Sequence, residues 1–463
     1  MISASTVAEI VGGVLHNLSG EELTDGSLFF DSRAPRKNGI FLALKGERVD
    51  GHDFAPNSGG AFALLERNLE CPAIIVPDVM KAAAKWATFY RSTLNELTVI
   101  GITGSQGKTT TKDMIAHILK TSLSSRNRGT VAPIGSYNND LGLPVTLTQC
   151  NESTGFCVAE MGARHLGDIY RLAQMARPSI GVVLKVGTAH LGEFGSREAI
   201  ARAKSELVMG IQPGGVAILG TYDEFTPKMA SQTPATVMYF GEKTSCDVRA
   251  TDIDIREGRA HFDLVSKAGR EPVALRLIGR HQVPNALAAA AIATALQMPI
   301  DKIASGLSTA EIASKWRMEI SDIGSLLLIN DSYNANPESM RAALETLRYF
   351  AQERGGRAWA FIGKMHELGE NSQRDHQSIT AFADQMGIDH VVAVNTPEYG
   401  NTSGAQLLVQ HVSSFDEALA ISKEITPGDV ILVKGSRAEG LEKLSDALKN
   451  ALLLDESAEE SGR

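Results

Sequence analysis

The sequence lacks the features that mark several classes of protein. Among its 463 residues are only four cysteines, and they show neither metal-ligand pairing nor the framework of a secreted disulfide-rich domain. No apolar run is long enough to span a membrane, and no basic leader opens the chain. We therefore expect a cytosolic protein with reduced thiols that is neither exported nor inserted in a membrane.

An excess of positive charge is also missing. Lys and Arg number 45 against 54 for Asp and Glu, and the resulting net charge of -9 argues against general nucleic-acid binding. What is present is the composition of a globular protein, with 43% hydrophobic and 21% charged residues. At roughly 150 residues per domain, the length predicts about three domains.

A glycine-rich turn near residue 105 joins an apolar strand candidate to a helical pattern. Gly104 and Gly107 let the backbone approach a phosphate closely, Lys108 adds a cation, and Thr109 is placed to ligate magnesium. The match is to Gly-x-x-Gly-Lys-Thr and not to the longer P-loop pattern, because Ile102 stands at that pattern's first glycine. We predict a nucleotide phosphate site; an ordinary turn with a surface lysine is the alternative.

Three side chains beyond this loop suggest a metal site. Glu160 ends a strand candidate, His190 follows the strand candidate 180–186, and Lys204 lies in the segment Ala-Lys-Ser-Glu. A carboxylate and an imidazole beside a phosphate loop predict magnesium ligands. Taken singly, each has a plainer explanation: a core or capping histidine, a solvated glutamate and a lysine on a helix surface.

The order of strand and helix candidates predicts an α/β fold in three domains. We place a small α/β unit at 1–94, a central ATPase-type unit with a mostly parallel sheet at 95–314, and a Rossmann-like α/β unit at 315–463. Segments 246–278 alternate like antiparallel hairpins. In the third unit, the strand ends Asn330-Asp331, Gly363 and Lys434-Gly435 are expected to meet at one edge.

These motifs resemble those of the Mur ligase family of ATP-dependent amide-forming enzymes. The resemblance runs nearly end to end and is carried by Thr103 to Thr110, Glu160-Met-Gly, Gly187-Thr-Ala-His, Ala203-Lys-Ser-Glu and Lys315-Trp-Arg-Met-Glu. Four further motifs are most similar to those of members that add D-alanyl-D-alanine to UDP-N-acetylmuramoyl-tripeptide: Gly46 to Phe54, Gly135-Ser-Tyr-Asn-Asn, Asn330 to Met340 and Val433-Lys-Gly-Ser-Arg.

The resemblance implies an acid–D-amino-acid ligase that works through an acyl phosphate. It implies two Mg²⁺ ions on Thr109, Glu160, His190 and Lys204, with Lys204 carbamylated by carbon dioxide, and catalysis by Lys108, Lys204, His190 and Arg317. The ATP site would comprise Gly104, Ser105, Gln106, Gly107, Lys108, Thr109, Thr110, Asn285, Arg317 and Asp331. The UDP-muropeptide would contact Ser32, Arg33, Lys45, Asn138 and Asn139. The dipeptide would face Tyr333, Asn334, Asn336, Lys434, Ser436 and Arg437.

Several of these residues also have structural explanations. Ser32, Arg33, Lys45 and Arg48 lie near turns where cations can hold a diphosphate, but a solvated polar loop has the same appearance. The segment Asn-Ala-Asn-Pro from residue 334 also forms turns, and Ser436 is also a suitable helix N-cap.

Other functions stay open at this stage. They are a sister ligase that adds another amino acid, a folylpolyglutamate synthase, a phosphate-loop kinase or ATP-driven switch, and a silent binding protein. We expect a monomer. Three positions depart from the usual letters of the family: Lys185 replaces Asn, Lys364 replaces Asp, and Ile134 replaces a small or polar residue.

Overall fold

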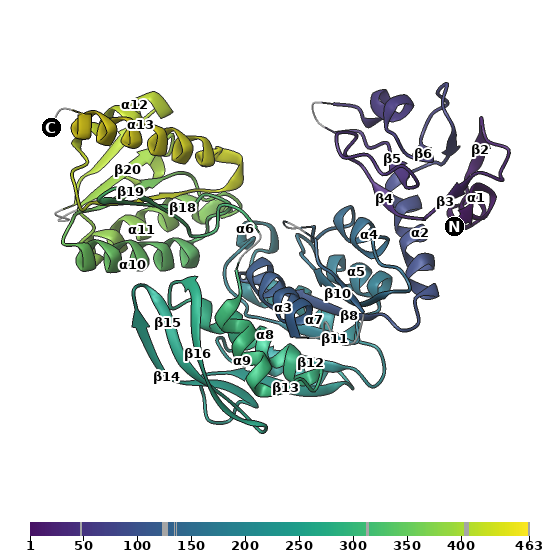
Figure 1. The fold of residues 1–463 in the computed structure, drawn as a ribbon, viewed down its shortest axis with the longest axis horizontal. Coiled ribbons are helices and arrows are strands. Elements are labelled where there is room, and N and C mark those ends of the chain that lie inside the picture. The colour runs from purple at the N-terminus through teal and green to yellow at the C-terminus, as the bar shows by residue number, and fades with distance from the viewer. Residues whose placement is uncertain are drawn as a thin grey trace.

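The computed structural model describes residues 1–46, 49–122, 128–133, 135, 137–311, 314–401 and 407–461, with the side chains of 122 and 455–461 left out. Arg48 and Ile134, singled out above, lie outside this part. The described chain forms three α/β units, and the N-terminal and C-terminal units stand apart on the same side of the central unit (Figure 1). The α/β fold class is therefore confirmed.

The N-terminal unit is built on a five-stranded sheet of order β2-β7-β6-β5-β4. Helix α1 is capped by Ser3 and ends at Gly12, whose φ of 75° is in the left-handed region that favours glycine. Trp86 of α2 is fully buried against the sheet. The elements are β1 (Ile2–Ser3), α1 (Ala4–Val11), β2 (Val14–His16), β3 (Leu23–Thr24), β4 (Leu28–Phe29), β5 (Ile40–Leu42), β6 (Phe62–Leu65), β7 (Ala73–Ile75) and α2 (Val79–Thr93).

The central unit holds a nine-stranded sheet of order β16-β15-β14-β13-β12-β11-β8-β10-β9. The strands from β8 to β14 pair in parallel, whereas β14, β15 and β16 pair antiparallel, as the alternating segments predicted. The elements are β8 (Thr98–Thr103), α3 (Lys108–Ser122), β9 (Gly129–Val131), α4 (Gly142–Leu147), β10 (Thr154–Glu160), α5 (Asp168–Ala176), β11 (Ile180–Val183), α6 (Leu191–Phe194), α7 (Arg197–Met209), β12 (Val216–Gly220), β13 (Thr236–Gly241), β14 (Val248–Arg256), β15 (Arg259–Ser266), β16 (Gly269–Ile278), α8 (Gln282–Ala295) and α9 (Ile300–Thr309).

The C-terminal unit holds a six-stranded sheet of order β17-β18-β22-β19-β20-β21, in which only β17 is antiparallel to its neighbour. Asp331 pairs in register with Lys434, whose carbonyl accepts a 2.8 Å hydrogen bond from the Gly363 amide. The expected cluster of strand ends is confirmed. The elements are β17 (Glu319–Ile323), β18 (Leu326–Asp331), α10 (Pro337–Arg354), β19 (Ala358–Ile362), α11 (Ser372–Met386), β20 (His390–Val394), β21 (Val409–Val412), α12 (Phe415–Ile421), β22 (Val430–Lys434) and α13 (Leu441–Ser461).

The linker 314–318 joins the central and C-terminal units. Trp316 and Met318 have φ values of 61° and 52°, a left-handed conformation that costs free energy for residues other than glycine. The Ser314 amide donates to Asp113 of α3 at 3.2 Å, and the Met318 amide donates to Asp331 of β18 at 3.2 Å. Each end of the linker is therefore fixed to a different unit.

All four cysteines are buried, and none takes part in a disulfide. Among the helices of the described ranges, none has the length and apolar character that crossing a bilayer requires.

The C-terminal unit depends on a buried carboxylate, and we expect Asp429→Ala to destabilise it. Asp429 is 1% exposed and accepts hydrogen bonds from Arg357, from the Trp359 indole at 2.9 Å and from the Thr426 amide at 3.0 Å. Breaking a buried charged network leaves donors unpaired, so the free energy of unfolding falls by about 3 kcal/mol. Urea unfolding measures this; Asp322→Ala, which breaks an exposed pair with Arg354, is the control and changes it by less than about 1 kcal/mol.

The same network sets a pH dependence. Burial raises the pKa of Asp429, but hydrogen bonds from Arg357 and Thr426 outweigh it and bring the pKa below its ordinary value. Because the pKa is lower in the folded state, the network stabilises the fold above the ordinary carboxyl pKa and loses this contribution as the pH falls below it. In Asp429→Ala, acid destabilisation of the C-terminal unit is correspondingly smaller; an unchanged acid profile would contradict this account.

Candidate active site

A cavity of about 1050 Å³ lies between the central and C-terminal units. It brings together most of the residues that the sequence singled out: Ser105, Gln106, Gly107, Lys108, Thr109, Thr110, Asn138, Asn139, His190, Lys204, Asn285, Arg317, Asp331, Tyr333, Asn334, Asn336, Lys434, Ser436 and Arg437. The phosphate loop of one unit therefore shares a cavity with the strand ends of another. Ser32, Arg33, Lys45, Gly104 and Glu160 do not line it.

The phosphate loop is fixed by close packing. A Cβ at Gly107, where φ is 82°, would lie 2.1 Å from the Asn285 side-chain oxygen, so only glycine fits at this position. Asn285 thus lies against the loop itself. The Ser105 amide donates to the Lys185 carbonyl at 3.0 Å, and the Ser105 hydroxyl accepts from the Gly187 amide at 2.8 Å. These bonds tie the loop to the end of β11.

Lys108 begins α3 and carries the cation of the loop. Its ammonium donates to the Gly104 carbonyl at 2.6 Å. Burial lowers the pKa of Lys108, and the carboxylate of Glu160 opposes this effect. The positive end of α3 and this ammonium form a suitable site for phosphate oxygens.

Glu160 lies beneath the loop at the end of β10 and is fully buried. Among the described residues, no hydrogen bond of ordinary geometry reaches either carboxylate oxygen, although the Thr109 hydroxyl is near enough to lower the pKa of Glu160. Burial raises the pKa of Glu160, against the opposing charges of Lys112 and Lys108. A buried carboxylate with unused oxygens is costly unless a cation approaches it, so this residue fits a magnesium ligand.

His190 and Lys204 lie on the far side of the loop. His190, with a φ of 63°, places Nδ1 2.6 Å from the Glu367 carboxylate, which leaves Nε2 as the nitrogen available to a ligand. Lys204 of α7 is 4% exposed, and burial, assisted by the charge of Lys108, lowers the pKa of Lys204 to about 7. An amine with this pKa is substantially neutral at pH 7 and therefore nucleophilic.

A complete metal site is not formed by acidic and imidazole groups alone. In the described ranges, no three His, Cys, Asp or Glu side chains lie close enough together to hold an ion. Glu160 and the Thr109 hydroxyl are the kind of oxygen donors that magnesium accepts in proteins.

Arg317 reaches from the linker into the nucleotide region. Its guanidinium donates to the Thr109 hydroxyl at 2.9 Å and stacks over the Tyr333 ring, 4.0 Å from the ring centroid. Asp331 pairs with the Lys434 ammonium at 2.5 Å, and Lys434 also donates to the Asn334 carbonyl at 2.8 Å. The residues expected to hold ATP and the dipeptide thus form one connected network.

The remaining dipeptide candidates also have structural roles. Asn336 accepts from the Ser339 amide at 2.9 Å, which makes it the N-cap of α10 and confirms the turn-forming interpretation of its segment. It also accepts from Gln106 of the phosphate loop at 2.7 Å. Ser436 accepts from the His366 amide at 3.0 Å, whereas it makes no side-chain cap bond to the short helix that follows.

The UDP candidates are divided between two units. Arg33 is 89% exposed and pairs with Asp31 at 2.8 Å. The Asn139 side chain accepts from the Leu141 amide at 3.2 Å and from the Gly142 amide at 2.9 Å, at the start of α4, whose N-cap residue is Leu141. The Tyr137 ring lies 6.0 Å from the Phe30 ring, so the loop that carries Asn138 and Asn139 lies against the N-terminal unit.

Two glutamates that the sequence reasoning missed join the units. Glu338 of α10 accepts from the Thr188 amide at 2.9 Å and from the Thr188 hydroxyl at 2.8 Å. Glu367 holds His190, and its carbonyl accepts from the Gly192 amide at 3.1 Å. Both lie in quoted or neighbouring motif segments, but only the tertiary structure shows which partners they have.

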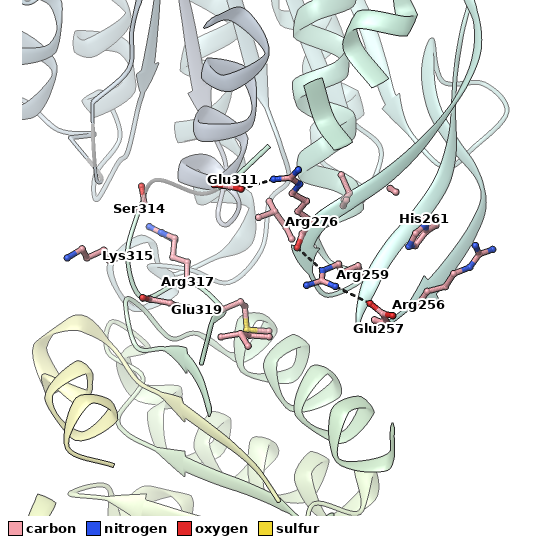
Figure 2. A pocket seen from close by; sticks show the side chains of 15 residues that line it. Arg256, Glu257, Arg259, His261, Arg276, Glu311, Ser314, Lys315, Arg317 and Glu319 are labelled. Atoms are coloured by element: carbon pink, nitrogen blue, oxygen red, sulfur yellow. Dashed lines mark hydrogen bonds and ion pairs between the residues drawn. The ribbon is translucent and has the colours of Figure 1, made fainter. Parts of the chain in front are cut away.

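A second cavity, of about 1000 Å³, lies on the other side of the linker, against β14 to β16 (Figure 2). Two of its arginines are paired with carboxylates: Arg276 with Glu311 at 2.8 Å and Arg259 with Glu257 at 3.3 Å. Arg317 lines both cavities.

Comparison with protein families finds two matches. Residues 102–293 match the Mur ligase middle domain, and residues 316–437 match the Mur ligase, glutamate ligase domain. These matches cover the phosphate loop, Glu160, His190, Lys204 and the strand ends of the C-terminal unit.

Characterised relatives are similar over nearly the whole chain. The UDP-N-acetylmuramoyl-tripeptide–D-alanyl-D-alanine ligase of Mycobacterium tuberculosis is 38% identical over 96% of this chain and 97% of its own length. The enzyme of the same name from Escherichia coli is 32% identical over 97% of this chain and 98% of its own length.

Solved structures share the fold. MurF from Acinetobacter baumannii superposes with a TM-score of 0.85 at 33% identity, covering 97% of this chain and 99% of its own. MurF ligase from Thermotoga maritima, solved in complex with ADP, gives a TM-score of 0.77 at 27% identity and covers 92% of this chain and 97% of its own.

Proposed function

The chain belongs to the Mur ligase family, and from this premise we propose that it joins D-alanyl-D-alanine to the carboxylate of UDP-N-acetylmuramoyl-tripeptide in an ATP-dependent reaction. The product is UDP-N-acetylmuramoyl-pentapeptide, a peptidoglycan precursor. The observation that carries the proposal is the end-to-end similarity to relatives named for this reaction.

The reaction needs ATP because a carboxylate is a poor acyl donor. The substrate carboxylate oxygen attacks the γ-phosphorus, ADP leaves, and an acyl phosphate forms. The dipeptide amine then attacks the acyl carbon, the phosphate leaves with the electrons of the C–O bond, and the nitrogen loses a proton. No obvious protein nucleophile is needed, which agrees with activation of the substrate itself.

The charges around the first step come from the cavity. Lys108 and Arg317 are placed to neutralise phosphate oxygens as negative charge collects between nucleotide and carboxylate. Thr109 and Glu160 would hold one magnesium ion; His190 and a carbamate on Lys204 would hold a second. Bound there, magnesium supplies electrostatic stabilisation of the transferring phosphoryl group.

Lys204 suits carbamate formation through its burial. Only a neutral amine adds to carbon dioxide, and a pKa of about 7 leaves much of this amine neutral at physiological pH. The addition forms an N–C bond and releases one proton. It converts the neutral amine into an anion that offsets the positive charge of Lys108.

The three units have separate roles in this proposal. Residues 1–94 with Asn138 and Asn139 hold the UDP-muropeptide, residues 95–314 hold ATP, and residues 315–463 deliver the dipeptide. Bonds from Glu338 and Glu367 to the central unit bring the dipeptide side of the cavity to the phosphate loop. Such positioning is worth roughly 7 to 11 kcal/mol of the reaction barrier.

We expect ADP release only when every substrate is present. The assay supplies UDP-N-acetylmuramoyl-tripeptide, ATP, magnesium and bicarbonate with D-alanyl-D-alanine, with a single amino acid, or with no amine. The proposal is supported if, of the three amine conditions, only the one with D-alanyl-D-alanine gives turnover and mass spectrometry shows a pentapeptide product. Turnover with a diamino acid would indicate a sister ligase, and equal ADP release without an amine would indicate an ATP-driven switch.

A further inference from the structure

Lys185 lies beside the phosphate loop, at a position where the family usually has asparagine. It follows β11, whose residue Val183 pairs in register with Thr103 of β8. Its carbonyl accepts the Ser105 amide at 3.0 Å, so its backbone is part of the support of the loop. Its side chain is half-buried and lines the nucleotide cavity.

The ammonium of Lys185 has no hydrogen bond or ion pair among the described residues. Two carboxylates are near enough to raise its pKa, those of Glu338 and Asp223, although burial has the larger effect and lowers it. The oxygens of Glu338 already accept from Thr188 and Gln106.

The oxygens of Asp223 are occupied in the same way. They accept from the Val186 amide at 2.9 Å, from the Phe225 amide at 2.8 Å and from both the amide and the hydroxyl of Thr226. Within the part of the chain that the structure describes, the cation therefore has no counterion at hydrogen-bonding distance. A partly desolvated ammonium in a nucleotide cavity is a site for an anion.

The surroundings place Lys185 on one side of the cavity. The pKa of His281, the residue before α8, falls to about 4 through burial; Asp331 opposes the fall, and the charges of Lys434 and Lys185 add to it. The pKa of Lys204, in contrast, is lowered by burial and by the charge of Lys108. Lys185, His281 and Asn285 line the same cavity, and the backbone of Lys185 is bonded to Ser105 at the start of the phosphate loop.

We infer that Lys185 is a nucleotide-binding residue of this chain whose ammonium contacts the phosphates nearest the ribose. The inference rests on the proposed ATP site. Because these phosphates remain on ADP, Lys185 stabilises ATP and ADP alike and leaves the chemical step unchanged. Asparagine at this position has no charge to offer a phosphate. This chain accordingly holds its nucleotide product more tightly than a Lys185→Asn variant does.

The test compares Lys185→Asn and Lys185→Arg with the wild type. Calorimetry with Mg·ADP and with adenosine gives Kd values, and steady-state kinetics gives KM for ATP and kcat. We expect Lys185→Asn to raise the Kd of ADP and the KM of ATP about tenfold and to keep kcat within about twofold. Adenosine affinity stays unchanged, because adenosine carries no phosphate, and Lys185→Arg restores ADP binding.

Lys243→Asn is the matched control, since it makes the same change at an exposed lysine near the cavity and leaves ADP binding unchanged. The inference is overturned if Lys185→Asn binds ADP within twofold of the wild type. It is also overturned if adenosine binding weakens equally, which would indicate a distorted pocket. A wild-type chain that binds neither ATP nor ADP would instead overturn the proposed function.

Discussion

Lys204→Met is expected to lower kcat by about three orders of magnitude while the fold is retained. Methionine is close to lysine in length and is compatible with a site that is 4% exposed, so α7 keeps its packing. What disappears is the amine that carbon dioxide needs, and with it an anionic oxygen near the γ-phosphate; losing one such electrostatic contribution costs about 3 to 4 kcal/mol of transition-state stabilisation.

The readout beyond activity is the carbamate itself. With ¹³C-labelled carbon dioxide, the wild type is expected to give a carbamate carbon signal by NMR that Lys204→Met lacks. Lys228→Met, a change at an exposed lysine, retains it. Full activity of Lys204→Met, or a signal that survives in it, would contradict the assignment.

The pKa of Lys204 predicts how carbamate formation depends on pH. Because burial lowers the pKa to about 7, the amine is mostly protonated below pH 7 and mostly neutral above it. At a fixed concentration of dissolved carbon dioxide, the rate of carbamate formation is expected to rise about tenfold from pH 6 to pH 8. An ordinary exposed lysine would keep rising well beyond pH 8, since its pKa is near 10.4.

Glu160→Gln is expected to lower kcat/KM about a thousandfold and to weaken binding of the metal. Glutamine has the same shape, but its amide lacks the charge that a fully buried carboxylate offers to a divalent cation. Manganese binding, followed by electron paramagnetic resonance in the presence of ADP, measures the metal separately from turnover.

The control for Glu160 lies just before the same strand. Glu152 is exposed, so Glu152→Gln makes the same chemical change outside the cavity and leaves manganese binding and kcat/KM unaltered. If Glu160→Gln binds manganese as tightly as the wild type, Glu160 is not a ligand, and its buried charge would then serve only to balance Lys108 and Lys112.

Local patterns predicted the parts of the molecule that depend on local chemistry. Apolar runs with polar ends identified β18, β19 and β22, and the rule for strand ends in open α/β sheets then placed Asp331 beside Lys434, as the register shows. The phosphate loop could also be predicted from the sequence, because Gly104 and Gly107 adopt backbone conformations that glycine favours.

Partners that come from another unit could not be derived in this way. Glu338 bonds Thr188 and Glu367 bonds His190 because of the way in which the two units dock. The periodicity of the sequence carries no information on this docking. Dual roles were also hidden: the Asn139 side chain accepts from two backbone amides at the start of α4, while the residue also matches a substrate motif. That the Asp223 carboxylate does not pair with the Lys185 ammonium can be concluded only once the other donors to Asp223 are known from the structure.

The linker also gives the molecule an intrinsic optical probe of its own closure. Of the three tryptophans, Trp86 and Trp359 are fully buried within their units, whereas Trp316 is half-buried in the linker with the Arg437 guanidinium 4.3 Å from its ring centroid. Rotation of one unit against the other changes the solvent next to this linker indole and leaves the other two undisturbed. Ligand-driven domain movement can therefore be followed by native fluorescence, without attaching a dye.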